Sequence, residues 1–196
     1  MTLSSSSNFG ELPPMSSINV VNDMSLPGVI LPPVPNLISN GNFESGLSGW
    51  SISGPVSPTI TTTALTGNNA AVLGWNPSSQ GGYSTIAQTI ALPTAIDRPT
   101  LSLVYQAISS WNPDPLVVTL AAGTTITTYT LPLNTTEWQD AWIDLDTLQG
   151  QVVQITLEIQ NSTTDYPNTV RLDDISLGPA SPGVTKVYLP ATMSGR

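Results

Sequence analysis

The chain has 196 residues, with thirteen acidic and four basic side chains, and its formal net charge at pH 7 is −9. This charge excludes a nucleic-acid partner, because phosphate binding needs clustered Lys and Arg. It also excludes a polybasic contact with anionic lipid. The sequence has no histidine and no cysteine, which excludes a histidine general base, thiol catalysis, thiolate metal sites and disulfides.

Residues 1–35 are predicted to form an extended N-terminal arm. They are rich in proline and poor in large side chains, a composition that favours polyproline II conformation and cannot build a core. Two short apolar pieces, "INVV" and "GVIL", look like strands without neighbours. Their apolar residues are Ile18, Val20, Val21, Val29, Ile30 and Leu31.

The sequence gives two indications about membranes and secretion. No stretch approaches eighteen consecutive apolar residues, so no transmembrane helix and no membrane insertion are expected. The start "MTLSSSSNFGELPPM" has neither the basic region nor the apolar segment of a signal peptide. We therefore expect a signal peptide to have been removed or to precede this start.

Residues 36–179 show short stretches that alternate or are β-branched, separated by turn residues. The alternation is most regular in "VVQITLEIQ", where Val153, Ile155, Leu157 and Ile159 face inward. In "STIAQTIAL", Ile86, Gln88 and Ile90 share one side, opposite Thr85, Ala87 and Thr89. No helical periodicity extends beyond about two turns. The fold class predicted for residues 36–179 is all-β, a jelly-roll β-sandwich, followed by a short C-terminal tail, residues 180–196, in which 184–189 could form one more strand.

The stretch "NLISNGNFESGLSGW" resembles the first strands of the carbohydrate-binding-module type of jelly roll, the galactose-binding-like sandwich shared with MAM-like domains. Further motifs agree in order: "GNNAAVLGW", "GGYSTIAQTIALP", "PTLSLVYQA", "EWQDAWIDLDTLQGQVVQITLEIQNST" and "TVRLDDISLG". The resemblance covers residues 36–178 and implies a non-catalytic secreted module of bacterial type. The fold itself hosts binding, adhesive and structural modules. The tail motif "KVYLPA" also resembles the "VYLP" endings of secreted proteins in some filamentous bacteria.

The resemblance implies one structural calcium ion where the first and last strands meet. It would place Glu44 near Asp173 or Asp174, with backbone carbonyls from the turn around Gly67 and Asn69. Ca²⁺ binds six to eight oxygens, so this mixture of ligands suits it. Adjacent side chains of a strand point to opposite faces, so only one of the two aspartates is expected to join Glu44. The alternative is that Glu44 caps a turn through backbone N–H groups, and that the aspartates merely end a strand.

Carbohydrate modules stack sugar rings on exposed aromatic side chains. Each of the five tryptophans is therefore assigned either to the core or to the surface. Trp50 matches a core position, and Trp138 is expected to pack over the sandwich edge. Trp142 should point outward, because its neighbours in "AWIDL" take the apolar face. Trp75 and Trp111 lie in polar, proline-bearing loops and are the best loop candidates for ligand contact.

A second candidate surface is the outward row of "VVQITLEIQ", which is Thr156, Glu158 and Gln160. Together with Gln106 and Thr119, this row could line a concave polar face that binds a glycan. A solvated outer face would have the same pattern.

Two functions follow from these features, and neither is catalytic, because a glycosidase needs two carboxylates flanking a cleft. The first is an extracellular or cell-surface structural subunit that assembles with copies of itself into a filament or layer. An extended arm of 35 residues would reach about 110 Å, while the sandwich has a radius of gyration of only ~15 Å. The arm could therefore add a strand to a neighbouring copy, or fold back on its own sandwich. The alternative function is a carbohydrate-binding module of a secreted protein, with a polysaccharide as partner.

Overall fold

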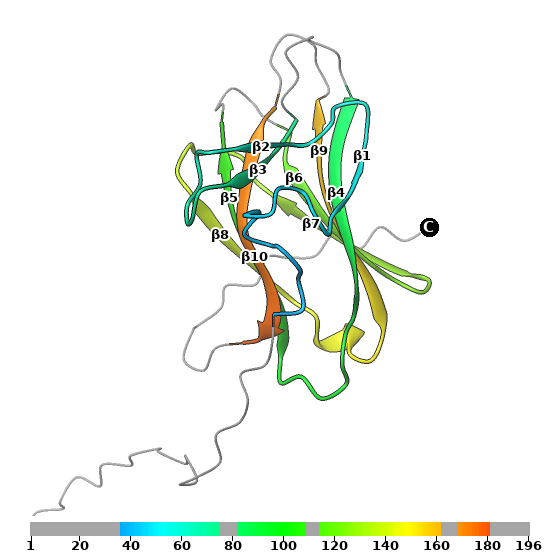
Figure 1. The fold of residues 1–196 in the computed structure, drawn as a ribbon. Helices are drawn as coiled ribbons and strands as arrows, with labels where there is room; N and C mark the ends of the chain where they lie inside the picture. Colours follow the sequence, from blue (N-terminus) through cyan, green and yellow to red (C-terminus); the bar gives the residue numbers. More distant parts are fainter. Residues whose placement is uncertain (1–35, 75–81, 109–113, 162–167, 181–196) are drawn as a thin grey trace, which may run out of the picture. The chain divides into compact units, whose positions relative to one another are not determined.

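The computed structural model describes residues 36–74, 82–108, 114–161 and 168–180 (Figure 1). The N-terminal arm with its six apolar assembly residues lies outside the described residues, as do Trp75, Trp111 and the tail from residue 181. Among the described residues, no helix is long and apolar enough to cross a membrane.

The described strands form two antiparallel five-stranded sheets, which we name sheet A and sheet B (Figure 1). Sheet A has the order β1 (Ser51–Ser53), β4 (Gly82–Ala91), β9 (Val152–Asn161), β6 (Leu116–Ala122) and β7 (Thr125–Leu131). Sheet B has the order β2 (Thr59–Thr61), β3 (Ala70–Leu73), β10 (Val170–Pro179), β5 (Pro99–Ala107) and β8 (Gln139–Asp144). One short 3-10 helix, Asp146–Leu148, lies between β8 and β9. The predicted all-β jelly-roll sandwich is confirmed.

The core lies between the sheets and follows the alternation of the sequence. All four inward residues of β9, from Val153 to Ile159, are completely buried, as are Ile86 of β4 and Leu101 of β5. Burying one such aliphatic side chain contributes roughly 1.5–3 kcal/mol to folding. The core side chains therefore supply the main free energy that pairs the two sheets.

Gln88 is a polar exception on the inward face of β4, and it is 8% exposed. Its Oε1 accepts a hydrogen bond from the backbone N–H of Ser39 (2.8 Å). Its Nε2 donates to the backbone oxygens of Ser39 (3.0 Å) and Gly49 (3.1 Å). One buried amide thus satisfies three backbone groups of the segment that precedes β1.

That segment, residues 36–50, is further ordered by Asn40 and two aromatic rings. Asn40 Nδ2 donates to the backbone oxygens of Gly46 and Ser48, both at 2.9 Å. Trp50 Nε1 donates to the Asn40 carbonyl (3.1 Å), and the Trp50 ring stacks on Phe43 with centroids 5.7 Å apart. Trp50 is 7% exposed, so its predicted core position is confirmed.

The same segment lies alongside the second half of β10, as the blue ribbon in Figure 1 shows. The backbone N–H of Leu37 donates to Leu177 O (2.9 Å), and that of Ile175 donates to Gly41 O (3.0 Å). Strand β3 pairs only with the first half of β10, up to Leu172. The segment therefore occupies the edge of β10 that β3 leaves open. A Cβ at Gly41 would overlap the Ile175 carbonyl, so this approach requires glycine.

Replacing Gln88 tests how much the fold depends on its three hydrogen bonds. Gln88→Leu keeps the apolar burial but leaves three backbone groups without their partner. We expect it to lower the free energy of unfolding by about 2–4 kcal/mol, measured by urea denaturation. Gln154→Leu, at an exposed position of β9, is the matched control and should change it by less than about 0.5 kcal/mol. Equal effects of the two variants would contradict this role.

Candidate functional site

The first predicted site residue, Glu44, contacts the turn formed by residues 65–69. Its Oε1 accepts hydrogen bonds from the backbone N–H groups of Asn68 (2.7 Å) and Asn69 (2.8 Å). Its Oε2 accepts a longer bond from Asn68 Nδ2 (3.3 Å). The backbone N–H of Asn68, followed by that of Asn69, lowers the pKa of Glu44 below its ordinary value of 4.5. Gly67 lies so close that a Cβ there would be 2.5 Å from Glu44 Oε1.

Asp173 and Asp174 contact the first part of the same turn. Asp173 is completely buried, and its Oδ2 accepts from the backbone N–H groups of Leu65 (2.9 Å) and Thr66 (3.1 Å). Asp174 accepts from the Thr66 hydroxyl, at 2.9 Å for each carboxylate oxygen. The structure thus brings all three predicted carboxylates to one turn.

The expectation that the two aspartates point to opposite faces is wrong. The pairing of β10 with β5 shifts register between Asp173 and Ser176, and Asp174 has a φ of 47°. A β-bulge adds one residue to a strand and redirects its side chains. The extra residue turns both carboxylates toward the 65–69 turn, an arrangement that strict alternation could not predict.

The donor set of these residues fits a calcium ion only in part. Asp173 and Oε1 of Glu44 already accept from backbone N–H groups. Within the described residues, Oε2 of Glu44 and the Asp174 carboxylate accept only from side chains that can rotate. Carbonyl oxygens of the turn would have to complete the six to eight ligands. Within the described ranges, no group of three or more Asp, Glu, His or Cys residues is placed to hold a metal. Calcium stays a prediction, and the observed bonds have the form expected of a capped turn.

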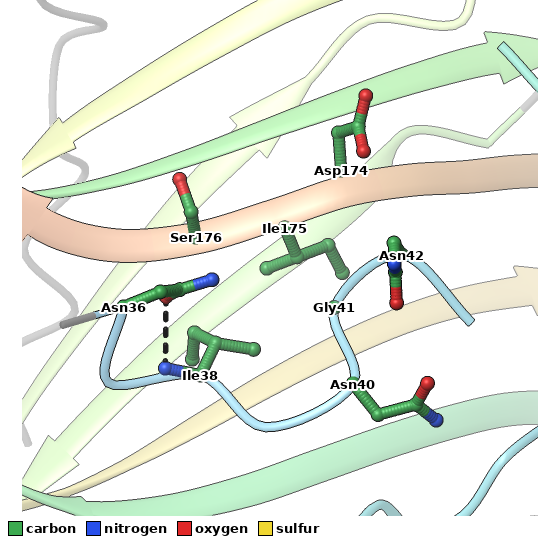
Figure 2. A pocket seen from close by; sticks show the side chains of 8 residues that line it. All are labelled: Asn36, Ile38, Asn40, Gly41, Asn42, Asp174, Ile175 and Ser176. Atoms are coloured by element: carbon green, nitrogen blue, oxygen red, sulfur yellow. Dashed lines mark hydrogen bonds between the residues drawn. The ribbon is translucent and has the colours of Figure 1, made fainter. Parts of the chain in front are cut away.

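A pocket of about 460 Å³ lies between the segment before β1 and the bulge of β10, as Figure 2 shows. Two of its polar side chains, Asn36 and Ser176, have structural partners. Asn36 Oδ1 accepts from the backbone N–H groups of Ile38 (3.0 Å) and Leu177 (2.9 Å). Ser176 Oγ shares a hydrogen bond with Ser102 Oγ (2.6 Å). The bond between Asn36 and Leu177 joins the segment to β10, and the serine pair joins β10 to β5, so these side chains serve the fold.

The outer face of sheet A carries a second constellation, at the end where β4 begins. Glu158 of β9 is half-buried, and its Oε2 accepts from the hydroxyl of Thr85 (3.1 Å). Its Oε1 accepts from Gln160 Nε2 (3.2 Å). Tyr83 lies directly opposite Gln160 and is 43% exposed. We call Tyr83, Thr85, Glu158 and Gln160 the Tyr83 face.

The threonines predicted for this surface lie in the next row of the sheet. Thr156 of β9 is paired with Thr119 of β6. Tyr83 was not predicted as a site residue. The alternation of "STIAQTIAL", extended by one residue toward the N-terminus, places Tyr83 on the same face as Thr85. Tyr83 is the aromatic side chain that the predicted polar row lacked.

Two predicted ligand residues lie on the other sheet. Gln106 is on β5 and Trp142 is on β8, both in sheet B. Gln106 cannot share a face with Glu158, so that part of the predicted surface is wrong. The alternation of a strand assigns its two faces but not the sheet to which it belongs. Trp142 is half-buried next to the buried Ala141 and Ile143, so its predicted outward direction is confirmed.

No protein-family model and no curated protein sequence matches the chain. Solved structures do match. TmCBM61 in complex with β-1,4-galactotriose has a TM-score of 0.59 at 16% identity, and the match covers 74% of this chain and 99% of that one. The family 11 carbohydrate-binding module from Clostridium thermocellum, in complex with a β-1,3-1,4-mixed-linked tetrasaccharide, has a TM-score of 0.52 at 14% identity, covering 76% and 98%. An exo-β-agarase matches with a TM-score of 0.54 at 12% identity over 75% of this chain and only 26% of its own. The predicted resemblance to carbohydrate-binding-module jelly rolls is confirmed for the fold.

Acid titration of stability tests the cap at Glu44. Because the pKa of Glu44 is lower in the folded chain than in the unfolded chain, the ionised carboxylate stabilises the fold fully above about pH 4.5. That contribution is lost as the pH falls through the lower folded-state pKa. We expect Glu44→Ala to be less stable than wild type at pH 7, and the difference to shrink on acidification, measured by urea denaturation. Glu137→Ala removes an exposed carboxylate and is the charge-matched control. A pH-independent difference would contradict the assignment.

The same variants separate the cap from a calcium site. A bound ion would raise the melting temperature of wild type when calcium is added, and Glu44→Ala would abolish that rise. An unchanged melting temperature in chelator would contradict the calcium prediction and leave the hydrogen-bonded turn as the role of Glu44.

Proposed function

We propose that this chain is a non-catalytic carbohydrate-binding module that binds a neutral polysaccharide on the Tyr83 face. The observation that carries the proposal is the Glu158 carboxylate, which accepts hydrogen bonds from Thr85 and Gln160 and lies on the same face of the sheet as the exposed Tyr83, opposite Gln160. Both oxygens of Glu158 keep lone pairs that can accept sugar hydroxyls. The tyrosine ring supplies a flat apolar surface with a polar tip.

The fold and the charge distribution support binding rather than catalysis. Glu158 is the only acidic residue in the five strands of sheet A, whereas glycoside hydrolysis uses two carboxylates across the scissile bond. The similar solved structures include two carbohydrate-binding modules in complex with oligosaccharides. An extracellular location agrees with this reading and is part of the proposal. Trp75 and Trp111 stay predicted ligand residues.

Affinity electrophoresis tests this proposal with soluble β-1,4-galactan, mixed-linkage β-glucan and agarose as probes. We expect at least one probe to retard the protein. Glu158→Gln should weaken binding about tenfold or more, since hydrogen bonds to charged groups contribute about 1.5–3 kcal/mol. Tyr83→Ala should weaken binding by a similar factor, because it removes the apolar ring surface that contacts the sugar. Val152→Ala is the matched control, because Val152 is an exposed residue at the far end of β9. The proposal would be contradicted if no probe retarded the protein, or if all three variants lost the same amount of affinity.

A second candidate function is self-association by strand addition. It is supported by the composition of the edge strand β7. The other edge strands of the described sheets are protected, because β1 and β2 have three residues each and β8 carries Asp140 and Asp144. β7 has seven residues, "TITTYTL", with no charge and no proline. Such an edge is open to pairing with another chain. In this candidate, an apolar piece of the N-terminal arm docks on β7 of a neighbouring copy.

Light scattering after size-exclusion chromatography tests strand addition. We expect the full chain to form oligomers, and deletion of residues 1–35 to give a monomer. Thr130→Lys places a charge on β7 and should also dissociate the oligomers, while Ser53→Lys on the opposite edge strand β1 should not. Unchanged assembly after the deletion would remove the arm from the mechanism.

A further inference from the structure

Arg171 lies on the outer face of sheet B and has no carboxylate partner among the residues that the structure describes. It lies on β10, paired with Val72 of β3 on one side and Gln106 of β5 on the other. Its guanidinium donates from Nη1 to Gln106 Oε1 (2.9 Å). Among the described residues, the ion pair that the structure contains joins Arg98 to Asp97 (4.0 Å) and does not involve Arg171.

The hydrogen bonds formed within the described residues satisfy the Arg171 guanidinium only in part. Arg171 is half-buried, and its Nε is buried with no acceptor within the described ranges. Withdrawing a cation from water is costly unless an anion or several acceptors replace the water. A neutral amide oxygen replaces only part of that solvation. The chain has thirteen acidic residues, yet none of those described pairs with this cation.

Gln106 positions the guanidinium rather than neutralising it. Gln106 Nε2 donates to the backbone oxygen of Thr136 (2.6 Å). That bond fixes the amide so that its oxygen, and not its nitrogen, faces Arg171. The arginine is therefore held from one side, while its other side lines a pocket.

This pocket, which we call the Arg171 pocket, has a volume of about 260 Å³. It combines aliphatic side chains, threonine hydroxyls and one guanidinium; its lining residues are Thr59, Ile60, Thr61, Val72, Ile108 and Arg171. Sites for drug-sized ligands have volumes of roughly 300–1,000 Å³, so this pocket suits a single ring. The hydroxyls suit a polar ring, and the guanidinium suits an anionic substituent on it.

We propose that the Arg171 pocket binds the carboxylate of an acidic sugar residue, a uronic acid. The Nε of Arg171 is buried, and the two terminal nitrogens of the planar guanidinium match a carboxylate in a bidentate geometry. A singly charged ligand is also repelled less than a doubly charged phosphate by a protein of net charge −9. The pocket lies on sheet B and the Tyr83 face lies on sheet A, so the inference stands apart from the proposed neutral-polysaccharide site.

Isotope-edited NMR titration of the full chain tests this inference, with the Nε–Hε signal of Arg171 as the probe. The ligands are galacturonate and glucuronate, their neutral counterparts galactose and glucose, and acetate as a carboxylate without a sugar ring. We expect the uronates to shift the Arg171 signal, the neutral sugars to leave it unchanged, and acetate to bind at least tenfold more weakly than the uronates. Raising the salt concentration should weaken uronate binding.

Two variants and two controls complete the design. Arg171→Gln keeps an amide that can bond Gln106, and it should weaken uronate binding at least tenfold. Arg98→Gln removes the same charge at an exposed site and should leave binding within twofold of wild type. Thr59→Tyr fills the pocket from an exposed position on β2 and should also block binding while Arg171 itself is retained. Urea denaturation checks that each variant is folded.

The outcomes separate this site from the proposed function. Loss of uronate binding in Arg171→Gln, with unchanged binding in Tyr83→Ala, supports the Arg171 pocket whether or not any neutral polysaccharide binds. Acetate binding as tightly as the uronates would overturn the sugar assignment. Absence of uronate binding, or equal binding by wild type and Arg171→Gln, would overturn the site itself.

Discussion

The close approach of Gly41 to Ile175 is the contact on which the rest of the sandwich depends. It allows the segment before β1 to hydrogen-bond with the last strand, because any side chain at residue 41 would overlap the Ile175 carbonyl. Once this segment is in place, Gln88 satisfies its backbone from the core side. Glu44 then lies where it can cap the 65–69 turn. One backbone contact therefore fixes the position of both the first segment and the carboxylates near β10.

The two outer faces of the sandwich differ in chemistry because their strands carry different charged residues. Sheet A presents threonines and alanines with a single carboxylate, Glu158, and its central strands β4 and β9 are ten residues long. In sheet B, β10 has a bulge whose aspartates contact the 65–69 turn, and β8 carries Asp140 and Asp144. A long polar sheet face suits an extended chain, whereas the pocket beside Arg171 suits a single ring. The proposed neutral and acidic ligands correspond to these two surfaces.

Much of the fold could be predicted from alternation alone, because inward residues such as Val153 and Ile155 repeat with the period of a strand. The candidate sites were predicted less well, for identifiable physical reasons. Alternation does not reveal which sheet a strand joins, so Gln106 was assigned to the wrong face. It also fails at a bulge, so Asp173 and Asp174 were expected to diverge. The Arg171 pocket combines residues of β2 and β3 with Ile108 and Arg171, which lie far from them in the sequence. No local sequence pattern therefore marks it.

The antiparallel pairing of residues 37–41 with β10 has a mechanical consequence. Residue 36 and the end of β10 leave the sandwich next to each other, because Asn36 and Leu37 both bond Leu177. A force that pulls the two ends of the sandwich apart is therefore borne first by the bonds at Leu177 and only afterwards by the bond from Ile175 to Gly41. These hydrogen bonds therefore break one after another, as in unzipping, and this requires less force than breaking them all at once. A module attached through both ends would open at this seam under tension while the bonds between β4 and β9 remain unloaded.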